Sequence, residues 1–182
     1  MRSSGWYWGV DARDLGLDSR SVALEAGKAG KFELSAGYRN LPHTLFDTTA
    51  TPFLIESRDS VVLPSGFVRA GATPRMTSLG SSLRQVDIGT ERQTVSAAAR
   101  FVLNPRWSLF ADFRHDQRDG TWRQGAAFAF SSVEIPRPVD YVTDQVVLGI
   151  AYGSERFSAR LAYEGSLFND RARDLTFENP YL

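Results

Sequence analysis

The stretch "SVALEAGKAGKFELSAGYR" (Ser21–Arg39) decides the fold, because its apolar residues recur at every second position. In its second half one face carries Phe32, Leu34, Ala36 and Tyr38, and the opposite face carries Lys31, Glu33, Ser35, Gly37 and Arg39. A period of two is typical of a β-strand whose two faces meet different environments. The small residues of Gly27–Gly30 predict a tight turn, so the stretch is predicted to be a β-hairpin.

Two further hairpins show the same pattern. The second hairpin joins Thr94–Leu103 to Trp107–Asp116, and the third joins Asp144–Gly153 to Arg156–Gly165. Each arm has about ten residues, which is the length of a membrane-spanning strand. The turns are predicted at Asn104–Arg106 and around Ser154–Glu155. An additional arm is predicted near Gly5–Arg13, which brings the total to about seven.

The connections between hairpins are long, at about residues 40–93 and 118–143, which is uncommon in a compact soluble domain. Short turns at one end and long loops at the other are typical of outer-membrane barrels. We therefore predict an all-β fold, an antiparallel up-and-down transmembrane β-barrel segment with short periplasmic turns and long extracellular loops. The spacing of Met76, Leu79 and Leu83 predicts one short helix near Met76–Arg84, in the first long loop.

Seven arms do not close an even-stranded barrel, and an open edge in lipid leaves backbone groups without partners. Residues 1–182 are therefore expected to form a single partial β-barrel domain, an internal fragment of a larger barrel. Aromatic residues near the arm ends predict an interfacial girdle formed by Tyr38, Trp107, Tyr152, Tyr163 and Phe168. Alternation alone leaves a second fold open, a soluble β-sandwich with one solvated face.

Composition excludes several kinds of site. The chain has no cysteine, so it cannot itself attach a c-type haem or build a cysteine metal site, and its formal net charge of zero gives no reason to expect nucleic-acid binding. His43 and His115 are predicted to have surface or packing roles, and the pairs Asp112/Asp116 and Asp119/Asp140 to be solvated charges. No catalytic, metal-binding or cofactor-binding residues are predicted, and the chain is not expected to be an enzyme.

A series of segments in this order resembles the MtrB/PioB family of decahaem-associated outer-membrane β-barrel proteins. The resemblance runs from about Ala12 to Tyr181 and is carried by "ARDLGLDSRSVALEAGKAGKFELSAGYRNLPH", "FDTTATPF", "SLRQVDIGTER", "WSLFADFRHDQRDGT", "PVDYVTDQVVLGIAYG" and "GSLFNDRARDLTFENPY". It implies an integral barrel of the bacterial outer membrane. It also implies a structural sheath that holds a periplasmic multihaem (decahaem) c-type cytochrome for extracellular electron transfer, in some cases together with an extracellular multihaem cytochrome.

The resemblance further implies that the partner cytochrome carries the haem. It also implies that charged residues facing the lumen contact this cytochrome. The lumen-facing candidates are Glu33, Arg39, Arg100, Asp112, Arg114, Arg160 and Glu164. The lipid-facing candidates are Phe32, Leu34, Phe101, Leu109, Phe113, Leu148 and Leu161. The same alternation also fits an ordinary diffusion porin or surface barrel with no redox partner, in which the charged residues face water.

Overall fold

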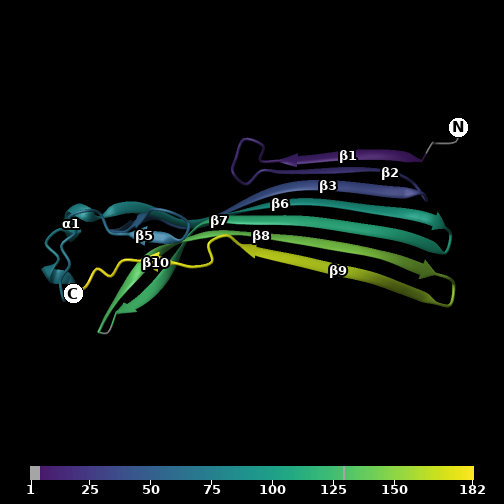
Figure 1. The fold of residues 1–182 in the computed structure, drawn as a ribbon. Coiled ribbons are helices and arrows are strands. Elements are labelled where there is room, and N and C mark those ends of the chain that lie inside the picture. The colour runs from purple at the N-terminus through teal and green to yellow at the C-terminus, as the bar shows by residue number, and fades with distance from the viewer. Residues whose placement is uncertain (1–4, 129) are drawn as a thin grey trace. The chain divides into compact units, whose positions relative to one another are not determined.

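The computed structural model describes residues 5–128 and 130–182, which are mostly β-strand with almost no helix (Figure 1). Seven strands form one antiparallel sheet in the order β1-β2-β3-β6-β7-β8-β9. They are β1 (Trp6–Arg13), β2 (Ser21–Lys28), β3 (Phe32–Thr51), β6 (Arg84–Asn104), β7 (Trp107–Phe128), β8 (Ser131–Gly153) and β9 (Ser158–Asp170). The order follows the chain, which confirms the up-and-down topology. β1 and β9 are the edges of the sheet, and closure into a barrel remains a prediction.

The three predicted hairpins and the additional first arm are confirmed. β2 pairs with β3 from Lys28↔Phe32 to Ser21↔Arg39, and β1 pairs with β2 from Trp6↔Lys28 to Arg13↔Ser21. The turn of the second hairpin is stabilised by Asn104, whose Oδ1 accepts hydrogen bonds from the backbone N–H groups of Arg106 (2.9 Å) and Trp107 (3.1 Å). This side-chain mimic of a backbone turn is typical of asparagine.

The prediction of a long loop over residues 118–143 is wrong, and the long loop predicted over residues 40–93 is shorter, at residues 52–83. β3 continues to Thr51 and β6 begins at Arg84, while β7 ends at Phe128 and β8 begins at Ser131. The segment 118–143 is therefore almost entirely strand.

The prolines that suggested loops fit within strands because each lies beyond the point where one of the two neighbouring strands ends. The last pair of β2 with β3 is Ser21↔Arg39, three residues before Pro42. Arg171 N–H donates to Asp140 O at the end of β9, so Pro136 and Pro138 lie beyond it. Proline is tolerated on an edge strand because its missing N–H removes no ladder bond there.

The chain divides into two compact units, and the long strands have residues in both. The first contains the chain up to Leu41 together with Arg92–Gln117 and Val142–Asn169, which are the predicted membrane-spanning arms. The second contains Pro42–Glu91, Arg118–Tyr141 and Asp170–Leu182. The prediction of a single partial domain remains a prediction.

The second unit has its own hydrophobic core. Phe53, Val61, Leu63 and Ile135 are buried together, with Phe177 packed against them. A small sheet in the order β10-β5-β4 lies at this core and contributes Val61 and Phe177; its strands are β4 (Leu54–Ile55), β5 (Ser60–Val62) and β10 (Thr176–Phe177).

A strap formed by β10 and the residues after it ties sequence-distant segments of the second unit together. β10 pairs parallel to β5, and Glu178 Oε2 accepts a hydrogen bond of 2.7 Å from Leu63 N–H. The helix predicted near Met76–Arg84 is shorter than expected: a 3₁₀ turn η1 (Thr73–Arg75) precedes the single turn α1 (Leu79–Ser82). Pro74 opens the 3₁₀ turn, as its fixed φ favours.

Replacing Ile135 with alanine should destabilise the second unit. The Ile135 side chain is fully buried, so truncation removes apolar contacts and leaves a cavity, and the expected loss is about 2–5 kcal/mol. Limited proteolysis of the full-length protein should detect this as faster cleavage within residues 53–67. The matched control is Ile55→Ala, because Ile55 is 43% exposed and should cost about 1 kcal/mol or less. Equal cleavage of the two variants would contradict the assignment of this core.

Candidate functional site: the polar face of the sheet

The strand register separates the sheet of the first unit into two faces. Val10 lies opposite Leu24, which lies opposite Ala36, whereas Glu25 lies opposite Gly9 and Ser35. Directly opposed residues share a face, so one face is built from apolar rows and the other from polar and small residues. We call the second of these the polar face.

The structure brings most of the predicted lumen-facing residues together. Glu33, Arg100, Asp112 and Arg160 line one hollow of about 440 Å³ on the polar face. Arg39 and Arg114 line another of about 390 Å³, with Asp11 and Arg13 from β1. Glu164 lines neither hollow. That this face looks into a lumen remains a prediction.

Four of the seven predicted lipid-facing residues line one apolar hollow of about 690 Å³: Phe101, Leu109, Leu148 and Leu161. Phe32 joins this group through Phe101, with ring centroids 6.2 Å apart. Leu34 and Phe113 lie outside the hollow and are 40% and 44% exposed. Side chains of this size, exposed on one face, are expected to meet lipid.

One aromatic residue departs from the alternation. Phe110 lines the polar hollow together with Arg160, whose guanidinium carbon lies 4.1 Å from the ring centroid. A Cβ atom at Gly149 would overlap the Phe110 ring, so the glycine provides the space in which the ring lies. The alternation of the sequence places Arg160 among the charged residues of the polar face, but it does not indicate the cation–π contact with Phe110. The available signal was Gly149, which interrupts the apolar run of its strand.

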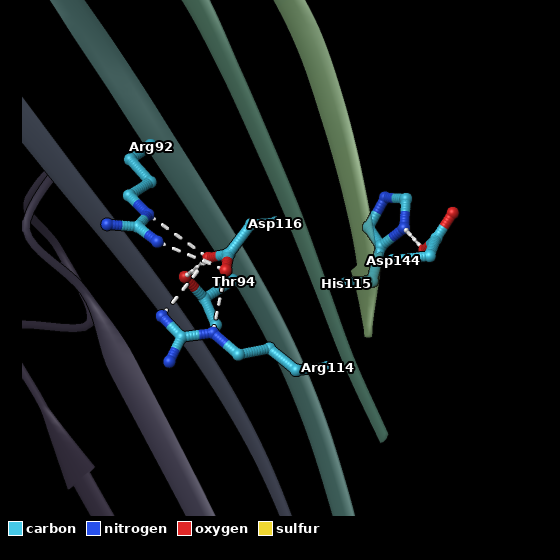
Figure 2. Close-up of polar contacts among 6 residues, drawn as sticks. All are labelled: Arg92, Thr94, Arg114, His115, Asp116 and Asp144. Atoms are coloured by element: carbon cyan, nitrogen blue, oxygen red, sulfur yellow. Dashed lines mark hydrogen bonds and ion pairs between the residues drawn. The ribbon is translucent and has the colours of Figure 1, made fainter. Parts of the chain in front are cut away.

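Asp116 is the centre of the strongest polar cluster on the strands (Figure 2). Arg92 Nε and Nη2 each lie 3.1 Å from a different carboxylate oxygen, and Arg114 Nε lies 2.6 Å from Oδ2. Thr94 Oγ1 also donates to Oδ1 at 2.6 Å. Asp116 is 8% exposed, so the prediction of a solvated charge is wrong for this residue. The carboxylate is buried because two guanidinium groups and a hydroxyl satisfy it.

His115 makes a short polar contact with the neighbouring strand. Its Nδ1 lies 2.6 Å from Asp144 Oδ1, and both side chains are more than a third exposed (Figure 2). His115 alternates with Asp116 along β7, so it belongs to the opposite face of the sheet. The predicted surface or packing role agrees with this contact.

Asp140 and Asp119 lie in the second unit, outside the predicted spanning arms. Asp140 is 7% exposed and pairs with Arg58 Nε at 3.0 Å and Arg171 Nη1 at 3.8 Å, so it is not the solvated charge that was predicted. Burial raises the pKa of Asp119, and the nearby carboxylates of Glu91 and Asp140 raise it further.

Two other features, a metal-binding group and a membrane-spanning helix, are absent from the described residues. Across residues 5–128 and 130–182, no group of three or more His, Asp or Glu side chains is placed to hold a metal ion. In the same part of the chain, no helix is long and apolar enough to cross a membrane.

Aromatic rings form two contact chains in the first unit. Phe32 lies between Trp6 and Phe101, with centroid distances of 5.5 and 6.2 Å. Tyr152 lies between Trp107 and Phe157, with distances of 4.8 and 6.1 Å. All six rings lie close to the short turns. Two of the predicted girdle residues, Trp107 and Tyr152, are therefore in contact. Tyr163 is exposed and remains a girdle prediction, together with Tyr38 and Phe168.

An antiparallel sheet with one apolar face, one charged face and aromatic residues near its short turns is typical of the class of outer-membrane β-barrel proteins. The profile of the outer membrane beta-barrel porin family MtrB/PioB matches residues 1–182, and the chain belongs to this family. It is 25% identical over 177 residues to "Outer membrane protein MtrB" of Shewanella baltica (strain OS185). That match covers 97% of this chain and 26% of the relative, so the chain spans about a quarter of that protein. The protein is located in the outer membrane.

Replacing Asp116 with asparagine should weaken the sheet. The amide keeps the shape but removes the charge that Arg92 and Arg114 share, and these guanidinium groups are half exposed. We expect a loss of about 1–2 kcal/mol in the free energy of unfolding of the full-length protein, measured with urea in phospholipid vesicles. Asp112→Asn is the control, because Asp112 forms no ion pair among the described residues. If both variants lose the same stability, the Asp116 cluster has no special role.

Spin labels at three neighbouring pairs should test the assignment of the faces. In the full-length protein in lipid, labels at Leu34, Phe113 and Leu161 should be relaxed mainly by oxygen, which concentrates in hydrocarbon. Labels at Glu33, Asp112 and Arg160 should respond less to oxygen, because their side chains lie on the other face. The measurement is saturation by electron paramagnetic resonance with oxygen and with a water-soluble nickel complex. The assignment fails if the first three positions prove more accessible to nickel than the second three.

Proposed function

We propose that this chain is part of a structural sheath in the outer membrane that encloses a multihaem c-type cytochrome. The barrel wall insulates and positions the cytochrome, and electrons cross the membrane through the haems of that partner. The chain itself binds no cofactor and catalyses no reaction in this proposal. An extracellular multihaem cytochrome is a second possible partner at the outer end.

The observation that carries the proposal is the shape of the polar face. The residues that lie between the charges on this face are small, and they include Ser35, Gly37, Ser96, Ala98, Ser108 and Ala151. Small residues let another polypeptide approach the sheet backbone closely, as they do at helix interfaces in membranes. The shallow hollows between the charges would then accept side chains of the enclosed protein.

The charges on this face also suit a protein contact. Arg92 and Arg114 share the Asp116 carboxylate, and Arg160 lies over the Phe110 ring. Side chains held in this way lose less conformational entropy when a partner binds. Charges of both signs would favour one orientation of the enclosed protein, since complementary charges determine register more than affinity.

The composition of the chain supports a haem that is carried by the partner. Covalent attachment of c-type haem needs a C-x-x-C-H motif, and these 182 residues contain no cysteine. The role left for the sheet is to separate the haem chain from lipid. The apolar face supports this role, because its exposed leucines and aromatic rings are suited to acyl chains.

A large side chain on the polar face should disrupt the complex. Ala98 lines a polar-face hollow, so Ala98→Trp in the full-length protein should block close approach of the cytochrome. Co-purifying haem, measured by Soret absorption per barrel, should fall by about tenfold if the contact loses about 1.4 kcal/mol. Ala97→Trp is the matched control, because Ala97 is predicted to lie on the apolar face and should leave haem recovery unchanged.

The same experiment separates the sheath from a diffusion porin. A porin would yield no haem with the unmodified barrel, and Ala98→Trp would instead reduce the flux of small solutes. Loss of haem with both tryptophan variants would indicate a folding defect and would remove this support for the sheath.

A further inference from the structure

The three short turns of the first unit form one continuous rim. The backbone N–H of Val102 donates to Lys31 O at 2.7 Å, which ties the first turn to the second hairpin. The N–H of Gly153 donates to Arg106 O at 2.8 Å, which ties the second hairpin to the third. In Figure 1 these turns lie together at one end of strands β2, β3 and β6–β9. The rim is therefore set by backbone hydrogen bonds.

Every turn of this rim carries a cation. The first has Lys28 and Lys31, the only two lysines of the chain, and the others have Arg106 and Arg156. Lys31, Arg106 and Arg156 are exposed, and none of the four cations forms an ion pair within the described residues. Glu155 is the one acidic residue in these turns, so the rim is positively charged.

Aromatic rings lie directly beside these cations. Lys28 Nζ is 5.4 Å from the centroid of the Trp6 ring. Arg106 and Arg156 line an open hollow of about 730 Å³ together with Tyr152 and the acidic Glu155, so the two cations outnumber the one carboxylate there. Trp6 and Phe157 are 60% and 62% exposed, as expected for rings at a membrane interface.

We propose that this cationic rim, made of Lys28, Lys31, Arg106 and Arg156, binds the phosphate groups of anionic phospholipids in the adjoining leaflet. Arginine can donate two parallel hydrogen bonds to a phosphate, and lysine can extend its ammonium group from an apolar base to the headgroup level. The hollow beside Tyr152 places two guanidinium-bearing residues where a headgroup would meet the aromatic rings. This role does not depend on the enclosed cytochrome.

The test uses the full-length protein in phosphatidylcholine bilayers with trace spin-labelled phosphatidylglycerol or phosphatidylcholine. Electron paramagnetic resonance gives the relative association of the two labelled lipids with the protein surface. The unmodified protein should prefer phosphatidylglycerol, and the preference should weaken at high salt. The combined Lys28→Gln, Lys31→Gln, Arg106→Gln and Arg156→Gln variant should lose the preference by about twofold or more.

Two controls distinguish position from total charge. Arg75→Gln with Arg84→Gln removes exposed cations from the second unit and should leave the lipid preference unchanged. Lys28→Arg with Lys31→Arg keeps the charge and should retain it. If the fourfold variant fails to assemble, Arg106→Gln with Arg156→Gln should show a smaller loss in the same direction.

Three results would overturn the proposal. One is the absence of any phosphatidylglycerol preference in the unmodified protein. Another is an equal loss in the Arg75 and Arg84 control. The last is a fourfold variant that keeps the preference for phosphatidylglycerol but loses a co-purifying soluble protein. That result would show that the rim binds a protein and not lipid. Haem recovery measured on the same variants reports separately on the sheath.

Discussion

Hydrocarbon offers no hydrogen-bond partners, so each backbone N–H and C=O within a membrane must be satisfied by the protein itself. In this chain the neighbouring strands provide those partners, from β1 to β9 in chain order. Once the backbone is committed to the ladder, successive side chains point to opposite faces. The remaining properties of the first unit follow from this: an apolar face, a polar face, and edges at β1 and β9 that need further strands as partners in lipid.

The two faces of the sheet differ in the residues that they carry and in how those residues are held. The apolar face is exposed and needs only large hydrophobic side chains. The polar face combines small residues with charges that are held by neighbouring side chains. The Asp116 cluster and the stack of Arg160 on Phe110 hold these charges in place, because each fixes a long cationic side chain.

Local signals in the sequence predict the hairpins well. The alternation of Lys31–Arg39 and the turn residues around Asn104 each depend on a few neighbouring residues, so both were predictable. The continuation of β3 and β8 past prolines was not, because it depends on which neighbouring strand has already ended. The burial of Asp116 was missed for a similar reason, since Arg92 and Thr94 reach it from another strand. The Arg114-x-Asp116 spacing on one face was the only local indication.

The strap in the second unit has a consequence for the order in which the chain folds. The hydrogen bond from Leu63 N–H to Glu178 joins residues 115 positions apart, and it completes a core that includes Val61 and Ile135. Contacts between such distant residues form slowly, because the intervening chain must first be ordered. The core around Val61 depends on a segment that follows β9 in the chain, so we expect this core to form late in folding.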